Sequence, residues 1–187
     1  VHAPINRAHP KVIDYATNGM RSDFMDIYLG AKCAFCISVG TGFDTVPIIF
    51  RRPVAYVNNV PAGYFFAFTD QIIGIFKHHL DADSNRELSL SEIFARGVGL
   101  SIGSDYETKG VDLIENTPEE IRDVAIEMVE RLEGTWQAHR DDEFLQQLFW
   151  EIFPTDAVHA FTGNPFHGEI HILFGAAFLR NNPEWLK

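Results

Sequence analysis

Basic residues are scarce in this sequence. Its 187 residues include 15 Lys and Arg against 26 Asp and Glu, so the formal net charge is −11 at pH 7. A protein that follows a nucleic-acid backbone needs clustered Lys and Arg to neutralise the phosphates. The dipeptide Arg51-Arg52 is the one basic cluster in the chain. The charge balance therefore argues against a nucleic acid as a partner.

Long apolar runs are missing as well. No stretch approaches the roughly 20 apolar residues that span a bilayer, and the first residues lack the basic-then-apolar order of a signal peptide. We therefore expect a cytoplasmic protein without a transmembrane segment. Peripheral attachment to the inner face of the membrane is compatible with this expectation. Because the chain begins with Val1 and soon enters patterned sequence, we also expect a fragment of a longer protein.

Cysteine is nearly absent, with one pair at Cys33 and Cys36. A redox-active pair of this spacing follows a strand at a helix N-terminus, whereas this pair enters an apolar strand expected over 35–39. A structural zinc site would need two more ligands of matching spacing. We interpret the pair as two ordinary buried thiols and expect no metal site.

The residues that are present suit one α/β domain. With 46% hydrophobic and 13% aromatic residues, the chain can bury a substantial core. Its apolar periodicities alternate between strand and helix, which predicts a Rossmann-like, doubly wound, mostly parallel sheet in a single domain over residues 1–187. The expected strands are 12–16, 35–39, 54–58, 72–78, 111–116 and a short one within 169–179, and the expected helices are 22–31, 43–50, 90–96, 117–134 and 141–153, with a loop over 97–110. The helix over 141–153 is expected to bury Phe144, Leu145, Leu148, Phe149 and Ile152.

The stretch 36–59 forms the expected centre of the domain, because it predicts a strand, a glycine turn, a short helix and a second strand. A ligand of such a sheet lies beyond the carboxyl ends of the strands, where this turn begins. Gly40 and Gly42 would let backbone amides approach an anion, and Thr41, Thr45 and the helix N-terminus add donors, which suits a phosphate. A tight turn with no ligand explains the same glycines.

This stretch resembles part of a known enzyme family. Ile37 to Val57 is similar, without a gap, to the carboxyl-terminal domain of GT-B glycosyltransferases of the heptosyltransferase kind. Their pattern is a strand, Asp-Thr-Gly-x-x-His, a small-residue helix, Pro and a second strand. Thr41 and Gly42 match this pattern, whereas Gly40 stands where the family has Asp and Thr45 where it has His.

A second resemblance extends over most of the chain. It is to a group of bacterial glycosyltransferases attached to surface-carbohydrate gene sets, which are longer and match this chain in their carboxyl half. The similar segments are 21–28, 116–121, 127–134 and 178–183.

These resemblances imply a nucleotide-sugar donor and a glycan or lipid-linked acceptor. They also imply that this chain is the carboxyl-terminal part of a two-domain protein whose amino-terminal domain is missing, and that the catalytic base belongs to that missing domain. The donor's diphosphate would be neutralised by helix dipoles and basic side chains rather than by a metal. Arg21 and Arg51 or Arg52 are the candidate cations, although each also suits an ordinary surface. The implied phosphate-binding residues are Gly40, Thr41, Gly42, Phe43, Asp44, Thr45 and Arg21, and the nucleoside-binding candidates at strand ends are Asn58, Asn59, Glu115 and Asn116.

Other interpretations stay open. A sugar-nucleotide epimerase has the same two-domain architecture. Residues 81–92 fit an EF-hand loop at several positions, which predicts a non-catalytic calcium- or sugar-binding module, but Arg86 stands where that loop needs Gly. His167, Glu169 and His171 would share one face of a strand and offer metal-type ligands, with ordinary polar placement as the alternative.

Overall fold

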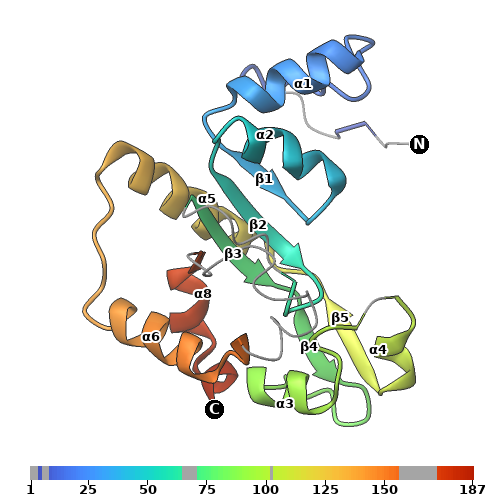
Figure 1. The fold of residues 1–187 in the computed structure, drawn as a ribbon, viewed down its shortest axis with the longest axis vertical. Helices are drawn as coiled ribbons and strands as arrows, with labels where there is room; N and C mark the ends of the chain where they lie inside the picture. The colour runs from blue at the N-terminus through green and yellow to red at the C-terminus, as the bar shows by residue number, and fades with distance from the viewer. Residues whose placement is uncertain (1–3, 6–8, 65–70, 102, 156–171) are drawn as a thin grey trace.

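The chain adopts an α/β fold (Figure 1). The structure is a computed structural model and describes residues 4–5, 9–64, 71–101, 103–155 and 172–187. Four parallel strands form the main sheet in the order β1-β2-β3-β6, and two antiparallel strands form a second, smaller sheet. The strands of the main sheet are β1 (Cys36–Ser38), β2 (Val54–Asn59), β3 (Ile72–Phe76) and β6 (Leu173–Phe174), and those of the second sheet are β4 (His78–Asp81) and β5 (Val111–Ile114).

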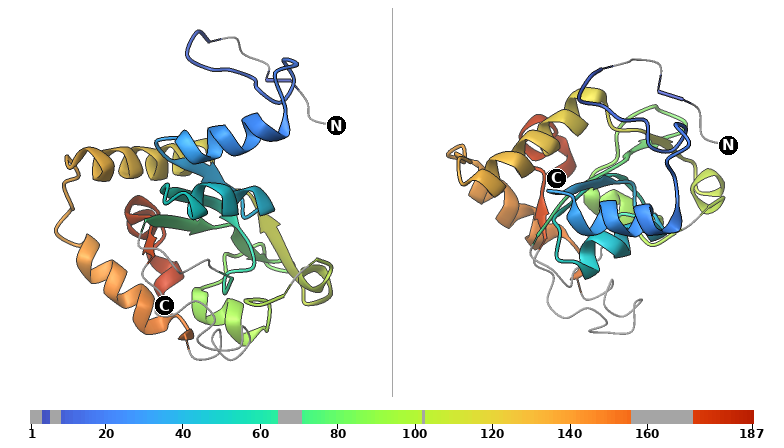
Figure 2. Two further views of the ribbon diagram at one scale, coloured as in Figure 1. Left: turned by 45° about the horizontal axis from the view of Figure 1, so that its top comes forward. Right: turned by 90° about the horizontal axis from the view of Figure 1, so that it is seen from above.

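Helices surround the main sheet. α5 packs against β2 and β3, α6 packs against α8 and β6, and α1 packs against α2 at one end of the molecule (Figures 1 and 2). The α-helices are α1 (Asp23–Lys32), α2 (Thr45–Ile49), α3 (Leu90–Ala95), α4 (Asp105–Thr108), α5 (Pro118–Glu133), α6 (Asp142–Ile152) and α8 (Ala176–Asn181), and the short 3-10 helices are η1 (Gly42–Asp44) and η2 (Pro183–Leu186).

The five expected helices are confirmed, and local chemistry explains their ends. At α5, the Thr117 side chain accepts from the backbone N–H of Glu120, while the Glu120 carboxylate accepts from the N–H of Thr117. This capping box satisfies two donors that have no partner within the helix. Gly134 then ends α5 in the left-handed conformation that glycine adopts without steric cost. Ser89 and Glu92 form the same box at α3.

The parallel sheet is confirmed, with one correction to its membership. The strand expected over 111–116 pairs with β4 in the second sheet, so it does not extend the parallel sheet. The strand expected over 72–78 is divided, because β3 ends at Phe76 and β4 begins at His78. A doubly wound sheet reverses its strand order at one point. Across the four strands described, the order follows the chain and contains no reversal.

Three further expectations are wrong. Residues 12–16, expected as a strand, form no strand and lead through a turn towards α1. The expected loop over 97–110 contains the short helix α4, in which Tyr106 is buried. The expected helix over 141–153 forms, but Phe144, which we expected to be buried, is 63% exposed because it lies on the outer face of α6.

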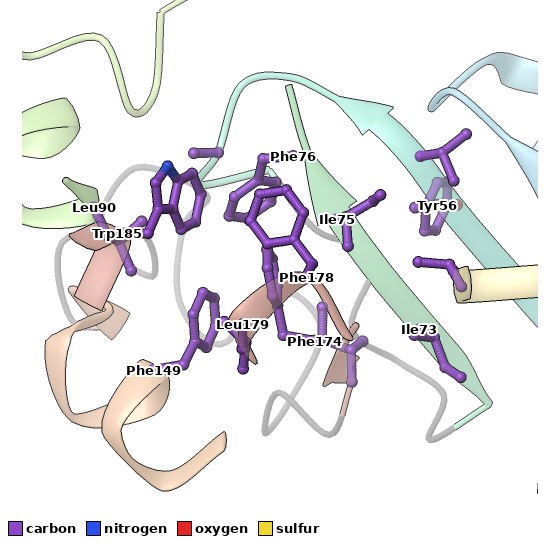
Figure 3. Close-up of a cluster of buried hydrophobic side chains, with 14 of the residues drawn as sticks. Tyr56, Ile73, Ile75, Phe76, Leu90, Phe149, Phe174, Phe178, Leu179 and Trp185 are labelled. Carbon is purple, nitrogen blue, oxygen red and sulfur yellow. The ribbon is translucent and has the colours of Figure 1, made fainter. Parts of the chain in front are cut away.

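The core gathers aromatic side chains from distant parts of the chain. Figure 3 shows Phe76 of β3, Phe149 of α6, Phe174 of β6 and Phe178 of α8 close together, with Trp185 of η2 among them. The rings of Phe149 and Phe174 stack with their centroids 4.4 Å apart, and those of Phe76 and Phe174 meet edge to face at 5.0 Å. These contacts fasten α6, α8 and η2 to the main sheet.

Candidate functional site

The glycine turn after β1 lies beside the carboxyl end of β2. Gly40 has a φ of +79°, and a Cβ at this position would lie 3.1 Å from the side-chain oxygen Oδ1 of Asn59. Only glycine combines this backbone conformation with so close an approach at little cost. The turn and the end of β2 therefore lie side by side.

The carboxyl end of β2 is also joined to the end of β5. The backbone N–H of Asn58 donates to Asn116 Oδ1 at 2.6 Å, and the N–H of Asn116 donates to Asn58 Oδ1 at 2.5 Å. The side-chain amide of Asn116 donates further to the carbonyl of Phe76, and that of Asn59 donates to the carbonyl of Tyr64. The structure therefore brings three of the predicted nucleoside-binding residues together.

These hydrogen bonds limit what the asparagines can offer to a ligand. Asn59 and Asn116 are each 5% exposed, and their amide N–H groups bind the backbone. Asn58 is half-buried and has a φ of +52°, a conformation that asparagine tolerates better than most residues. Glu115 points outward and forms an exposed ion pair with Lys77, with Oε1 and Nζ 3.4 Å apart. It is the freest of the four predicted nucleoside contacts.

The outer surface of the turn is open. Thr41, Gly42, Phe43 and Thr45 are exposed, and a Cβ on Gly42 would meet nothing within 4 Å. The Thr45 hydroxyl donates to the carbonyl of Gly42 at 2.7 Å, which fixes the first turn of η1 and α2. A ligand can therefore reach the backbone of this turn without displacing a side chain.

Asp44 lies beneath the same turn and has no exposed surface. Its Oδ1 accepts from the Ser38 hydroxyl of β1, and its carboxyl also interacts with the Tyr56 hydroxyl of β2. Burial raises the pKa of Asp44, and the hydrogen bonds from Ser38 and Tyr56 oppose that shift. Asp44, which we predicted among the phosphate-binding residues, is thus placed to hold the turn onto the sheet and not to contact a ligand directly.

Arg21 lies on the Phe43 side of the turn. The two residues share a shallow cavity of about 260 Å³, whose lining is completed by Tyr15, Ala16, Asp26 and Leu29. The Nε atom of Arg21 is 3.4 Å from Asp26 Oδ2, so a nearby carboxylate partly offsets its charge. This shared cavity brings the predicted cation to the predicted turn.

The other two candidate arginines have different surroundings. Arg52 donates from Nε to the carbonyl of Ala31 at 2.8 Å, which satisfies a backbone acceptor in the last turn of α1. Arg51 is exposed, with a φ of +54°. Arg52 therefore acts within the fold, and Arg21 is the arginine best placed to face an anion at the turn.

The loop over 81–92 binds arginines where an EF-hand would bind calcium. Asp81 accepts from the N–H and hydroxyl of Ser84 and pairs with Arg96, interactions that lower its pKa. Glu92 binds both terminal nitrogens of Arg86, at 2.9 and 2.7 Å, which with its contacts to Ser89 lowers its pKa to about 2. Since the first and last carboxylates of the loop already hold cations, this geometry disfavours the calcium-binding alternative.

The remaining candidate residues give no support for a metal site or a reactive thiol. Cys33 and Cys36 are free and half-buried, and burial, with smaller effects from Cys33 and Asp44, raises the pKa of Cys36 to about 11, away from the thiolate. His167, Glu169 and His171 lie outside the described residues. In the ranges that the structure does describe, no group of three or more His, Cys, Asp or Glu side chains is placed to hold a metal ion.

Two features of this region were not predicted from the sequence. One is the contact of Ser38 and Tyr56 with Asp44. The sequence shows only that each of the two apolar strands contains one of these polar residues, and it does not show that both side chains meet Asp44. The other is His78, whose ring nitrogens bind Glu87 at 2.7 Å and Glu120 at 3.1 Å. Because Glu120 lies 42 residues further along the chain, no local pattern indicates this pair.

Comparisons with protein-family models, with curated proteins and with solved structures find no match to this chain. Across the part of the chain that the structure describes, no helix combines the length and the apolar character needed to cross a bilayer.

Proposed function

We propose that this chain is the nucleotide-sugar-binding domain of a GT-B-type glycosyltransferase that acts in surface-glycan synthesis. The donor's diphosphate binds at the turn formed by Gly40, Thr41 and Gly42. Glu115 and Asn58 lie on the nucleoside side, and Arg21 contributes positive charge on the Phe43 side. The glycan or lipid-linked acceptor and the catalytic base belong to another part of the enzyme.

One observation carries the proposal. The turn after β1, the end of β2 and the end of β5 meet at the carboxyl edge of a parallel sheet, and the exposed backbone of Gly42 faces open space there. Ligands of open α/β sheets bind in this position, where backbone amides can approach a phosphate. The sequence resemblance supplies the nature of the ligand, namely a nucleoside diphosphate linked to a sugar.

A thermal-shift assay with a panel of nucleoside diphosphates and their sugar conjugates tests the site. We expect at least one nucleotide to raise the Tm of the wild-type protein, because a ligand that binds only the folded state stabilises it. Gly42→Val places a side chain in this open space, where a Cβ would meet no protein atom within 4 Å. Without nucleotide, this variant should have about the same Tm as the wild type. It should bind the nucleotide at least about tenfold more weakly, a loss of about 1.4 kcal/mol in binding free energy.

Ala34→Val is the matched control, because it adds apolar bulk to an exposed position two residues before β1. It should bind the nucleotide like the wild type. The site is wrong if no nucleotide raises the Tm, or if Gly42→Val and Ala34→Val respond equally to the nucleotide that does.

A further inference from the structure

The outward face of α5 carries a groove with exposed apolar side chains. The groove has a volume of about 450 Å³ and is lined by Phe35, Arg122, Ala125, Ile126, Val129, Glu130, Glu133 and Thr135. Ile126 is 47% exposed and Val129 is 37% exposed. They lie on the side of α5 opposite its buried residues Val124 and Met128, and α5 lies on the outside of the molecule in both views of Figure 2.

Charge is ordered along this groove. Arg122, Ile126, Val129 and Glu133 follow one another at intervals of three or four residues, so they form a single stripe on the helix. The stripe begins with a cation, continues with two apolar side chains and ends with an anion. The Arg122 side chain is 60% exposed, and its pair with Asp123 is a surface contact that leaves the guanidinium able to reach further partners.

A stripe with this order is complementary to its own reverse. If a second α5 lies antiparallel to the first, with a two-fold axis crossing between residues 127 and 128, Ile126 faces Val129 of the partner subunit. Arg122 then faces Glu133 of the partner subunit, and the symmetry repeats both contacts. An interface between identical subunits needs such self-complementarity, because the same patch must serve on both sides.

We propose that this groove is the interface of a homodimer in which the α5 helices of two copies pack antiparallel. The occupant is a second copy of this chain, since the charge order matches that partner without any further residue. One helix pair buries less than the roughly 1,200–2,000 Å² of a standard interface. The dimer is therefore reversible and depends on concentration, and it does not rest on the proposed nucleotide site.

Sedimentation-velocity measurements over a concentration series test the dimer. The wild type should pass from monomer to dimer as concentration rises. Arg122→Glu and Glu133→Arg each place like charges opposite one another twice, so each variant alone should dimerise at least about tenfold more weakly. When the two variants are mixed, opposite charges face each other again in both contacts, and the heterodimer should form with about wild-type affinity.

Arg140→Glu is the matched control. Arg140, like Arg122, pairs with the aspartate that follows it, and its side chain is 91% exposed just before α6, outside the α5 stripe. This variant should dimerise like the wild type, and circular dichroism checks that all the variants stay folded. The proposal is overturned if the wild type remains a monomer throughout the series, or if the mixture of the two charge variants dimerises no better than either one alone.

Discussion

His78 and His79 are adjacent in sequence, but the fold shifts the pKa values of their side chains in opposite directions. They are consecutive residues of β4 and therefore point to opposite sides of the strand. The hydrogen bonds that His78 donates to Glu120 and Glu87, against the effect of burial, raise the pKa of His78 to about 10. Burial lowers the pKa of His79 to about 4. At neutral pH one ring is therefore a cation that joins β4 to α5, and the other is a neutral core side chain.

The charge on His78 should make stability depend on pH in the alkaline range. Its folded pKa of about 10 lies above the value of 6.5 for a free side chain, so its full contribution is present below pH 6.5. That contribution falls as the pH rises towards 10 and is lost above it. At pH 6, His78→Gln should therefore lower the free energy of unfolding by about 2–4 kcal/mol.

Urea denaturation of the wild type and His78→Gln at several pH values measures this contribution. The difference between the two proteins should shrink steadily from pH 6.5 to pH 10. A difference that stays constant over this range would show that His78 acts through packing alone, for instance through its ring contact with Phe178, whose centroid lies 5.5 Å away.

At the scale of the element, η2 shows how a chain end can belong to the core. The segment 181–185 reads as a polar tail, since Asn, Pro and Glu surround one aromatic residue. In the structure Trp185 is fully buried, with its ring centroid 5.6 Å from that of Phe76 and 5.4 Å from that of Phe178. The bulk of one indole therefore outweighs the polarity of its neighbours and anchors the whole segment.

Trp185→Ala should be among the most destabilising single substitutions in the chain. Removing a fully buried indole loses its packing and leaves a cavity, which costs about 3–5 kcal/mol. Phe144→Ala is the control, because that ring is 63% exposed on α6, and it should change stability by no more than about 0.5 kcal/mol. Denaturant midpoints compare the two variants. Similar midpoints for both would contradict the core position of Trp185.

Elements with strong local signals could be predicted from the sequence, and those set by distant contacts could not. The Thr117 and Glu120 capping box and Gly134 define α5 through neighbours in sequence. β5 instead pairs with β4, whose residues lie 30 to 36 positions before their partners, so its sheet is decided by long-range hydrogen bonds. The turn could be predicted because Gly40 and Gly42 themselves form it. The role of Asp44 beneath the turn depends on the pairing of two strands, which the sequence does not show.

At the scale of the whole molecule, the two sheets are joined where their strands end. The reciprocal bonds of Asn58 and Asn116, together with the bond from Asn116 to Phe76, connect β2 and β3 to the strand end that leads into α5. This junction lies directly beside the glycine turn through the contact of Gly40 with Asn59. The candidate site and the connection between the sheets therefore share the same residues.

Those shared residues have a consequence for native-state hydrogen exchange. Because each backbone amide proton of Asn58 and Asn116 is held by the other residue's side chain, both should exchange in a single opening event with the same free energy.

Asn116→Ala should divide that event in two, with the amides of β4 and β5 exchanging faster while those of β2 keep their protection. Measured by mass spectrometry, unchanged protection of β4 in this variant would mean that the second sheet is stable by itself. Faster exchange of β4 in this variant would show that the two sheets of the wild-type protein open as one cooperative unit. In that case a ligand that tightens the glycine turn would slow exchange as far away as β4.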